Sequence, residues 1–90
     1  MANTKSALKR IRVSEKRRLR NREVRSETRT YVRRARVSIE NNPAGSTADI
    51  TRAVSALDRA ARKGVIHPNN AARRKSRLMR RLNARQHATQ

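Results

Sequence analysis

The sequence predicts an all-α protein, a three-helix up-down-up bundle whose long, highly basic N-terminal helix extends beyond the bundle. Neither glycine nor proline occurs between Lys5 and Glu40, and this stretch is rich in good helix formers. Both glycines and both prolines of the chain lie within residues 41–47 and 64–70, where turns are therefore expected. Apolar residues recur at helical spacing between and after these two breaks. We interpret the 90 residues as one small domain.

The first helix is expected over residues 5–41, and its apolar face changes side midway. Leu8, Ile11 and Leu19 share one side of the helix. A stripe about 100° wide lies on nearly the opposite side and consists of Val24, Thr28, Tyr31, Val32, Ala35 and Ile39. Only the C-terminal half thus has a face suited to a bundle. We expect residues 1 to about 20 to be largely disordered without a partner, because little apolar surface holds them.

The second helix is expected over residues 46–63 and has the cleanest amphipathic pattern of the chain. Ser46 or Thr47 is its expected N-cap, and its apolar face consists of Ile50, Ala53, Val54, Leu57, Ala60 and Ala61. Gly64 occupies the position of a left-handed cap residue, and the two apolar residues after it should fold back onto the helix end.

The third helix is expected over residues 68–86. Proline suits its first position, and the cap should come from His67, Asn69 or Asn70. The residues expected to face inward are Ala71, Ala72, Leu78, Met79 and Leu82. The tail from Gln86 is expected to fray.

The charge of the chain points to a polyanionic partner. The formal net charge is +19, and the 25 cations divide into 14 in the first helix, 4 in the second and 7 from Arg73 onward. The second helix is thus a scaffold candidate, and the other two carry the expected binding surface. Arginine outnumbers lysine 20 to 5, which favours nucleic acid because guanidinium groups hold phosphates bidentately. A single aromatic residue argues against base-stacking modules, so we interpret the protein as a binder of structured RNA backbones.

No pattern in the sequence indicates catalysis, a cofactor or a metal site. The chain has no cysteine, and His67 and His87 lack neighbours at metal-ligand spacing. No glycine elbow presents a serine within the expected helices as a nucleophile, which applies to Ser6, Ser26, Ser38, Ser55 and Ser76. Tyr31 and Met79 are interpreted as core residues. We therefore expect neither an enzyme nor a small-molecule substrate.

Membrane association is also not expected. No apolar run approaches the roughly 20 residues of a membrane span, and the N-terminus lacks an apolar signal core, so the sequence favours a cytoplasmic protein. A membrane-active helix would need one continuous apolar face, and the first helix has two separate ones.

Three segments resemble the bacterial small-subunit ribosomal protein S20 family: "MANTKSALKRIR" at 1–12, "RRLRNR" at 17–22 and "LDRAARKGVIHPNNAARRKSRLMRRLNA" at 57–84. The resemblance covers nearly the whole chain in order and spacing. It implies a structural constituent of the small ribosomal subunit that binds 16S ribosomal RNA directly and stabilises its folding and assembly. The implied RNA partners are the 5′ domain and the long 3′ minor-domain helix.

Charge distribution and resemblance together give one set of candidate RNA-binding residues in two segments. The set is Lys5, Lys9, Arg10, Arg12, Lys16, Arg17, Arg18, Arg20, Asn21, Arg22, Arg25, Arg29, His67, Arg73, Arg74, Lys75, Ser76, Arg77, Arg80 and Arg81. The alternative function is a histone-like DNA-compacting protein, which charge and helicity alone would permit. Selectivity for folded RNA over duplex DNA at equal salt distinguishes the two.

Overall fold

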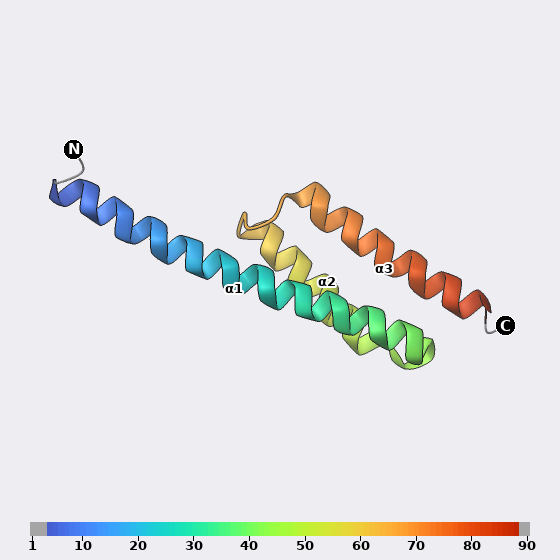
Figure 1. The fold of residues 1–90 in the computed structure, drawn as a ribbon. Helices are drawn as coiled ribbons and strands as arrows, with labels where there is room; N and C mark the ends of the chain where they lie inside the picture. Colours follow the sequence, from blue (N-terminus) through green and yellow to red (C-terminus); the bar gives the residue numbers. More distant parts are fainter. Residues whose placement is uncertain (1–3, 89–90) are drawn as a thin grey trace.

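The computed structural model describes residues 4–88 and confirms the all-α fold class. Its helices are α1 (Lys5–Asn41), α2 (Thr47–Arg62) and α3 (Pro68–Ala88), and a 3₁₀ turn, η1 (Pro43–Gly45), joins the first two. No strand occurs in residues 4–88. As Figure 1 shows, α2 runs back along α1 and α3 runs back along α2, so that the three helices alternate in direction.

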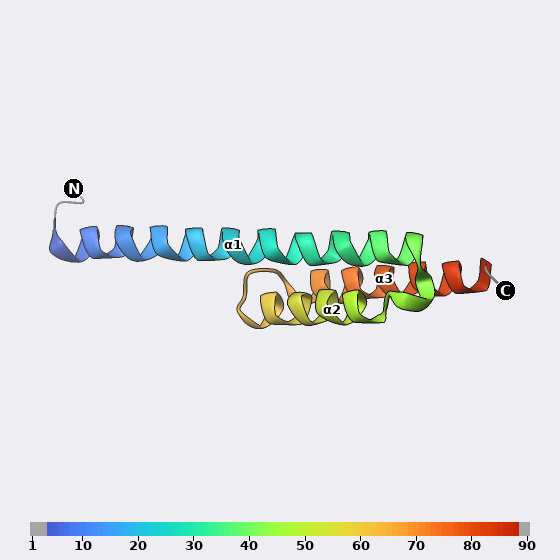
Figure 2. The same cartoon turned by 90° about the horizontal axis from the view of Figure 1, so that it is seen from below.

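The molecule is elongated because only the second half of α1 belongs to the bundle (Figure 2). The chain measures 66 × 20 × 16 Å, and its radius of gyration is 18.0 Å, against about 12 Å for a compact domain of this length. The apolar side chains of the free half are exposed, with Leu8 and Ile11 at 46% and Leu19 at 57%. The two apolar faces of α1 therefore have different surroundings: one lies in the bundle and the other in solvent.

The structure describes residues 5–20 as helical. The disorder expected for residues 1 to about 20 concerns the protein without a partner in solution and stays a prediction. Thr4 caps this end, because its Oγ1 accepts a hydrogen bond from the backbone N–H of Ala7 at 3.2 Å. The helix then continues without a residue that would break it into the half that packs on α2 and α3. Residues 1–3 lie outside the described residues.

Amide hydrogen exchange in the absence of RNA should divide α1 into two halves. Residues 5–20 are held by their own helical hydrogen bonds, and their side chains are almost all exposed, so local opening there should need little free energy. Residues 28–39 contain the buried positions of α1. Their amide hydrogens should exchange only when the whole bundle unfolds. Exchange measured by NMR or mass spectrometry tests this, and equal protection of the two halves would contradict it.

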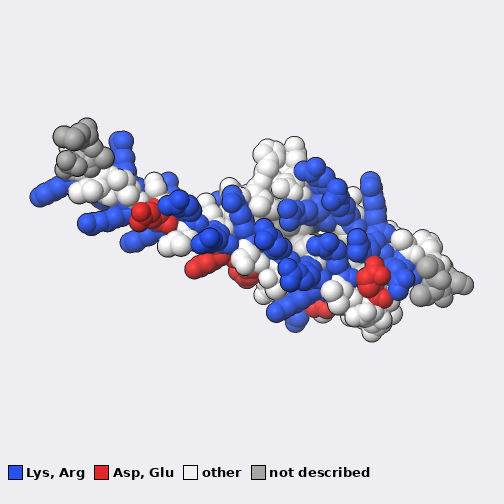
Figure 3. All heavy atoms as spheres, in the orientation of Figure 1, with Lys and Arg blue, Asp and Glu red and all other residues white. Residues whose placement is uncertain are grey.

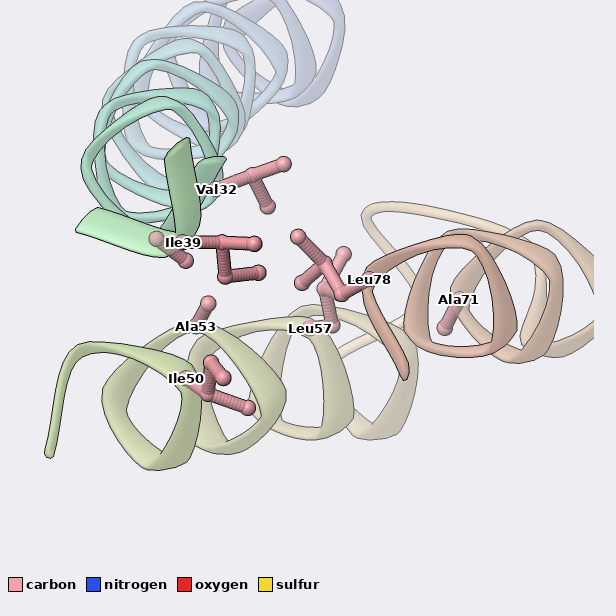
Figure 4. Packing of buried hydrophobic residues seen from close by; sticks show 8 residues of the cluster. Val32, Ile39, Ile50, Ala53, Leu57, Ala71 and Leu78 are labelled. Carbon is pink, nitrogen blue, oxygen red and sulfur yellow. The ribbon is translucent and has the colours of Figure 1, made fainter. Parts of the chain in front are cut away.

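The core lies where the three helices face one another (Figure 4). Its buried residues are Val32, Ala35 and Ile39 from α1, Ile50, Ala53 and Leu57 from α2, and Ala71 and Leu78 from α3. Tyr31, Val54, Ala61, Ile66 and Leu82 pack against this cluster. The predicted inward faces of α1 and α2 thus supply most of the core.

Two residues of α3 predicted to face inward are instead exposed. Ala72 is exposed, and Met79, interpreted above as core, is 45% exposed. Each follows directly after a buried residue, Ala71 and Leu78, and is therefore rotated by about 100° from it. The helix buries only a narrow stripe, because the core that it covers is small.

Gly64 ends α2 with the left-handed backbone expected from the sequence, at φ 77°. The N–H of Val65 donates to the carbonyl of Ala60 at 2.9 Å, and the N–H of Gly64 donates to that of Ala61 at 3.0 Å. These two bonds form a Schellman motif, which places Val65 in a buried position at the helix end.

Gly64→Ala should lower the free energy of unfolding by about 1–2 kcal/mol, because an L-residue is strained at positive φ. No heavy atom lies within 4 Å of the added Cβ, so the backbone conformation alone should cause the loss. Urea denaturation followed by circular dichroism measures it. Lys63→Ala is the control, since Lys63 has φ −77° and an exposed side chain. An equal effect of both substitutions would show that the left-handed conformation is not the cause.

The structure shows which of the candidate residues cap α2 and α3. Ser46 is the N-cap residue of α2, but its side chain makes no cap hydrogen bond. Its buried hydroxyl donates to the carbonyl of Pro43 at 2.7 Å and so closes the linker turn. At α3, Nδ1 of His67 accepts from the N–H of Asn69 at 3.1 Å. The third helix continues to Ala88, two residues beyond the end expected from the sequence, and residues 89–90 lie outside the described residues. The expected fraying from Gln86 onward stays a prediction.

Glu40 connects the C-terminal ends of α1 and α3. Its carboxylate lies 3.7 Å from Nη1 of Arg81 and 3.9 Å from Nε of Arg85. Arg85 also donates from Nη2 to the backbone carbonyl of Glu40 at 2.8 Å. These contacts hold the C-terminal end of α1 beside the C-terminal part of α3.

Candidate nucleic-acid interface

Seven arginines line a groove between α1 and α3. Its volume is about 800 Å³, and Val32 and Leu78 are its apolar lining residues. The other residues that line it are Arg29, Arg36, Asn70, Arg73, Arg74, Arg77, Arg80 and Arg81. We call this the basic groove. In Figure 3, Lys and Arg side chains crowd over the region where α1 and α3 lie beside each other.

A smaller hollow, here called the end pocket, lies where α3 begins. It has a volume of about 300 Å³ and is lined by Arg25, Thr28, Arg29, Val65, Ile66, His67, Asn70 and Arg74. It shares Arg29, Asn70 and Arg74 with the basic groove, so the two hollows adjoin. Val65, Ile66 and His67 form one side of the end pocket. The Schellman motif at the end of α2 and the cap of α3 determine the position of these three residues.

The basic surface continues from the groove onto the free half of α1. A shallow surface there is lined by Arg17, Arg18 and Arg22 together with half-buried Asn21, and it includes Arg25 and Arg29 of the end pocket. The remaining predicted residues of this half are Lys5, Lys9, Arg10, Arg12, Lys16 and Arg20, and all of them are exposed. They point around the helix rather than into one site.

Carboxylates do not line the basic groove or the end pocket. Glu23 and Glu27 line a different hollow, on the side of α1 that carries Tyr31. Asp58 lies 2.7 Å from Nζ of Lys75, and Asp49 lies 3.6 Å from Nη1 of Arg52. Two acidic residues lie closer to the basic surface: Glu40 contacts Arg81 of the groove, and Glu15 lines the surface on the free half of α1. The other four lie away from the groove, which strengthens its positive potential.

The structure assembles only part of the candidate set into one site. Five of the candidates on α3, Arg73, Arg74, Arg77, Arg80 and Arg81, face α1 across the groove. Lys75 and Ser76 do not line it, and Lys75 is paired with Asp58. The candidate set omits Arg36 and Asn70, which line the groove. Arg36 follows Arg29 by two helical turns, so its helical spacing is the signal that could have identified it.

Two other kinds of site find no support in the residues described. Within residues 4–88, no three His, Asp or Glu side chains are grouped so that they could hold a metal ion. None of α1, α2 and α3 is apolar over a length that would cross a bilayer.

Comparison with known proteins identifies the family. The family model described as Ribosomal protein S20 matches residues 2–83. A small ribosomal subunit protein bS20 from Thermomicrobium roseum is 56% identical over 85 residues, which are 93% of this chain and 86% of that protein. The bS20 proteins of Clostridium perfringens and Mycolicibacterium smegmatis are each 49% identical, over 93% and 92% of this chain and 98% of their own lengths.

These matches confirm the resemblance noted in the sequence. The relatives are structural proteins of the small ribosomal subunit, a family without known enzymatic activity, which agrees with the expectation that the chain is not an enzyme. The small subunit is cytoplasmic in bacteria, so the expected location is confirmed as well. The chain belongs to the ribosomal protein S20 family and is a structural component of the small ribosomal subunit.

Proposed function

We propose that the protein binds 16S ribosomal RNA directly, through contacts to the phosphate backbone, and thereby stabilises the folding and assembly of that RNA. One observation carries the proposal: seven arginines and no carboxylate line the groove between α1 and α3, and one of the seven, Arg81, contacts a carboxylate, that of Glu40 at 3.7 Å. Guanidinium groups bind phosphate oxygens in a bidentate manner, and like charges at this density favour a polyanion that neutralises them.

The same surface favours backbone contacts over base stacking. Tyr31 is the only aromatic residue of the chain, and it packs against the core while the Arg34 guanidinium lies 5.9 Å from its ring centre. The chain therefore offers few aromatic rings to unpaired bases, whereas RNA-binding modules of the stacking kind depend on them. This scarcity favours recognition through phosphates and shape.

The free half of α1 supports a second contact region. Cations project from it around most of the helix, so a position between RNA elements would satisfy more of them than a single flat surface. The family resemblance further favours the 5′ domain and the long 3′ minor-domain helix of 16S ribosomal RNA as these elements. We assign the whole described chain to one RNA-binding domain on these grounds.

RNA footprinting with the purified protein on naked 16S ribosomal RNA, across a salt series, tests the proposal. We expect protection of discrete sites and an affinity that falls steeply with salt, because each neutralised phosphate releases condensed counterions. Duplex DNA of matched length at equal salt is the comparison. Equal affinity for the DNA and the folded RNA would overturn the proposal in favour of a DNA-compacting function.

A further inference from the structure

We propose that the end pocket is a binding site for a single phosphate group, and that in the assembled complex it holds one phosphodiester of the bound RNA. The groups that would hold it are the guanidinium groups of Arg25, Arg29 and Arg74 and the imidazole of His67. Only the source of the phosphate rests on the proposed function. The pocket itself is argued from its own residues.

The composition of the pocket suits an anion of this size. Three arginines from two helices line a hollow of about 300 Å³ together with one histidine, and no acidic residue is among its lining residues. Residues 68–71 at the start of α3 add no free backbone donor. Pro68 has no N–H, the N–H of Asn69 is bonded to His67 Nδ1, and the N–H groups of Asn70 and Ala71 are bonded to the His67 carbonyl. An anion in the pocket would therefore be held by side chains.

Two of the three arginines are already oriented by the protein. Nε of Arg74 donates to Oδ1 of Asn70 at 3.0 Å, which leaves both terminal amino groups of the guanidinium for a ligand. One terminal amino group of Arg25 makes a long hydrogen bond of 3.5 Å to the carbonyl of Val65. Side chains held in this way lose less conformational entropy when a phosphate binds, so the site should be stronger than three mobile arginines.

A hydrogen bond within the protein also orients the His67 ring and determines which of its nitrogens can donate to a ligand. Because its Nδ1 accepts the hydrogen bond from Asn69, the proton of the neutral ring is on Nε2, which remains a donor. The imidazole is held at the pocket by the turn that Gly64 makes possible. The end pocket thus differs from the rest of the basic groove, whose cations lie along two open helix faces.

The first experiment uses inorganic phosphate and no RNA. Phosphate is titrated against chloride at constant ionic strength while ¹H–¹⁵N spectra record backbone amides and arginine Nε groups. We expect saturable shifts confined to residues 64–70 and to the Nε groups of Arg25, Arg29 and Arg74. Uniform shifts of all arginine signals, or the same shifts with chloride alone, would overturn the proposed pocket and leave the proposed function standing.

The second experiment separates orientation from charge in RNA binding. Asn70→Ala keeps every charge but releases Arg74, so we expect several-fold weaker binding to 16S ribosomal RNA with an unchanged salt dependence. Arg74→Gln should weaken binding about tenfold or more, as loss of hydrogen bonds to a charged group does, and should lower the salt slope by about 1.

Arg62 on α2 supplies the matched control. Arg62→Gln removes one charge by the same substitution, but Arg62 is exposed and lines neither the basic groove nor the end pocket, so RNA affinity and salt slope should hardly change. Melting temperatures show that each variant is folded. Equal losses for Arg74→Gln and Arg62→Gln, or no loss for Asn70→Ala, would overturn the pocket. Absence of specific RNA binding by the wild-type protein would instead overturn the proposed function.

Discussion

Leu57→Ala is expected to lower the free energy of unfolding by about 2–5 kcal/mol, the usual range for a buried leucine. Leu57 has no exposed surface and is one of the largest fully buried side chains of the described chain. It projects from α2 toward the facing residues of α1 and α3 (Figure 4). Because few large side chains form this core, neighbouring residues can fill only a small part of the cavity that the substitution would leave.

Chemical denaturation followed by far-ultraviolet circular dichroism measures this loss. Met79→Ala is the control, because it also shortens a large apolar side chain, but one that is 45% exposed. We expect that control to cost well under half as much. A change near zero for Leu57→Ala would mean that the core has been assigned to the wrong face of α2.

Neutralising the middle of the basic groove should have the largest effect on RNA binding. The variant replaces Arg36, Arg73, Arg77 and Arg80 with glutamine and leaves the end pocket and the Glu40 contacts intact. If each arginine neutralises one phosphate, the slope of log affinity against log salt should fall by about 3–4. At moderate salt, the affinity for 16S ribosomal RNA should fall on the order of 100- to 1,000-fold.

The matched control removes the same number of charges from α2 and its cap. It replaces Arg52, Arg59, Arg62 and Lys63, all exposed, with glutamine, and none of these residues lines the basic groove or the end pocket. Filter binding or fluorescence anisotropy across a salt series compares the two variants. A much smaller change is expected for the α2 variant. Equal changes would mean that total charge, rather than the groove, determines binding.

Local signals account for how much of the fold could be predicted from the sequence. Gly64 and Pro68 mark a turn through backbone properties that hold in almost any surroundings, and the α2 face repeats at helical spacing over about three turns. The errors occur where packing decides. Ala72 and Met79 are apolar but exposed. Ser46 is the N-cap residue of α2, but its hydroxyl donates to the carbonyl of Pro43 and does not accept a cap hydrogen bond.

The candidate site was predictable as two basic segments but not as a groove. Charge counts identify α1 and α3, since no acidic residue occurs from Arg73 onward. Which side of α3 faces α1 depends on how the third helix crosses the first two, and apolar spacing alone leaves that open. For this reason Lys75 could not be separated from Arg74, although the first pairs with Asp58 and the second lines the groove.

The uninterrupted length of α1 has a mechanical consequence. The helix spans 37 residues, Lys5–Asn41, without an internal glycine or proline, so it has no hinge between the bundle and its free end. A partner that binds the bundle therefore also determines the direction of α1, which is about 55 Å long. The number of residues in α1 therefore sets the distance between a contact at its N-terminal end and a contact at the basic groove.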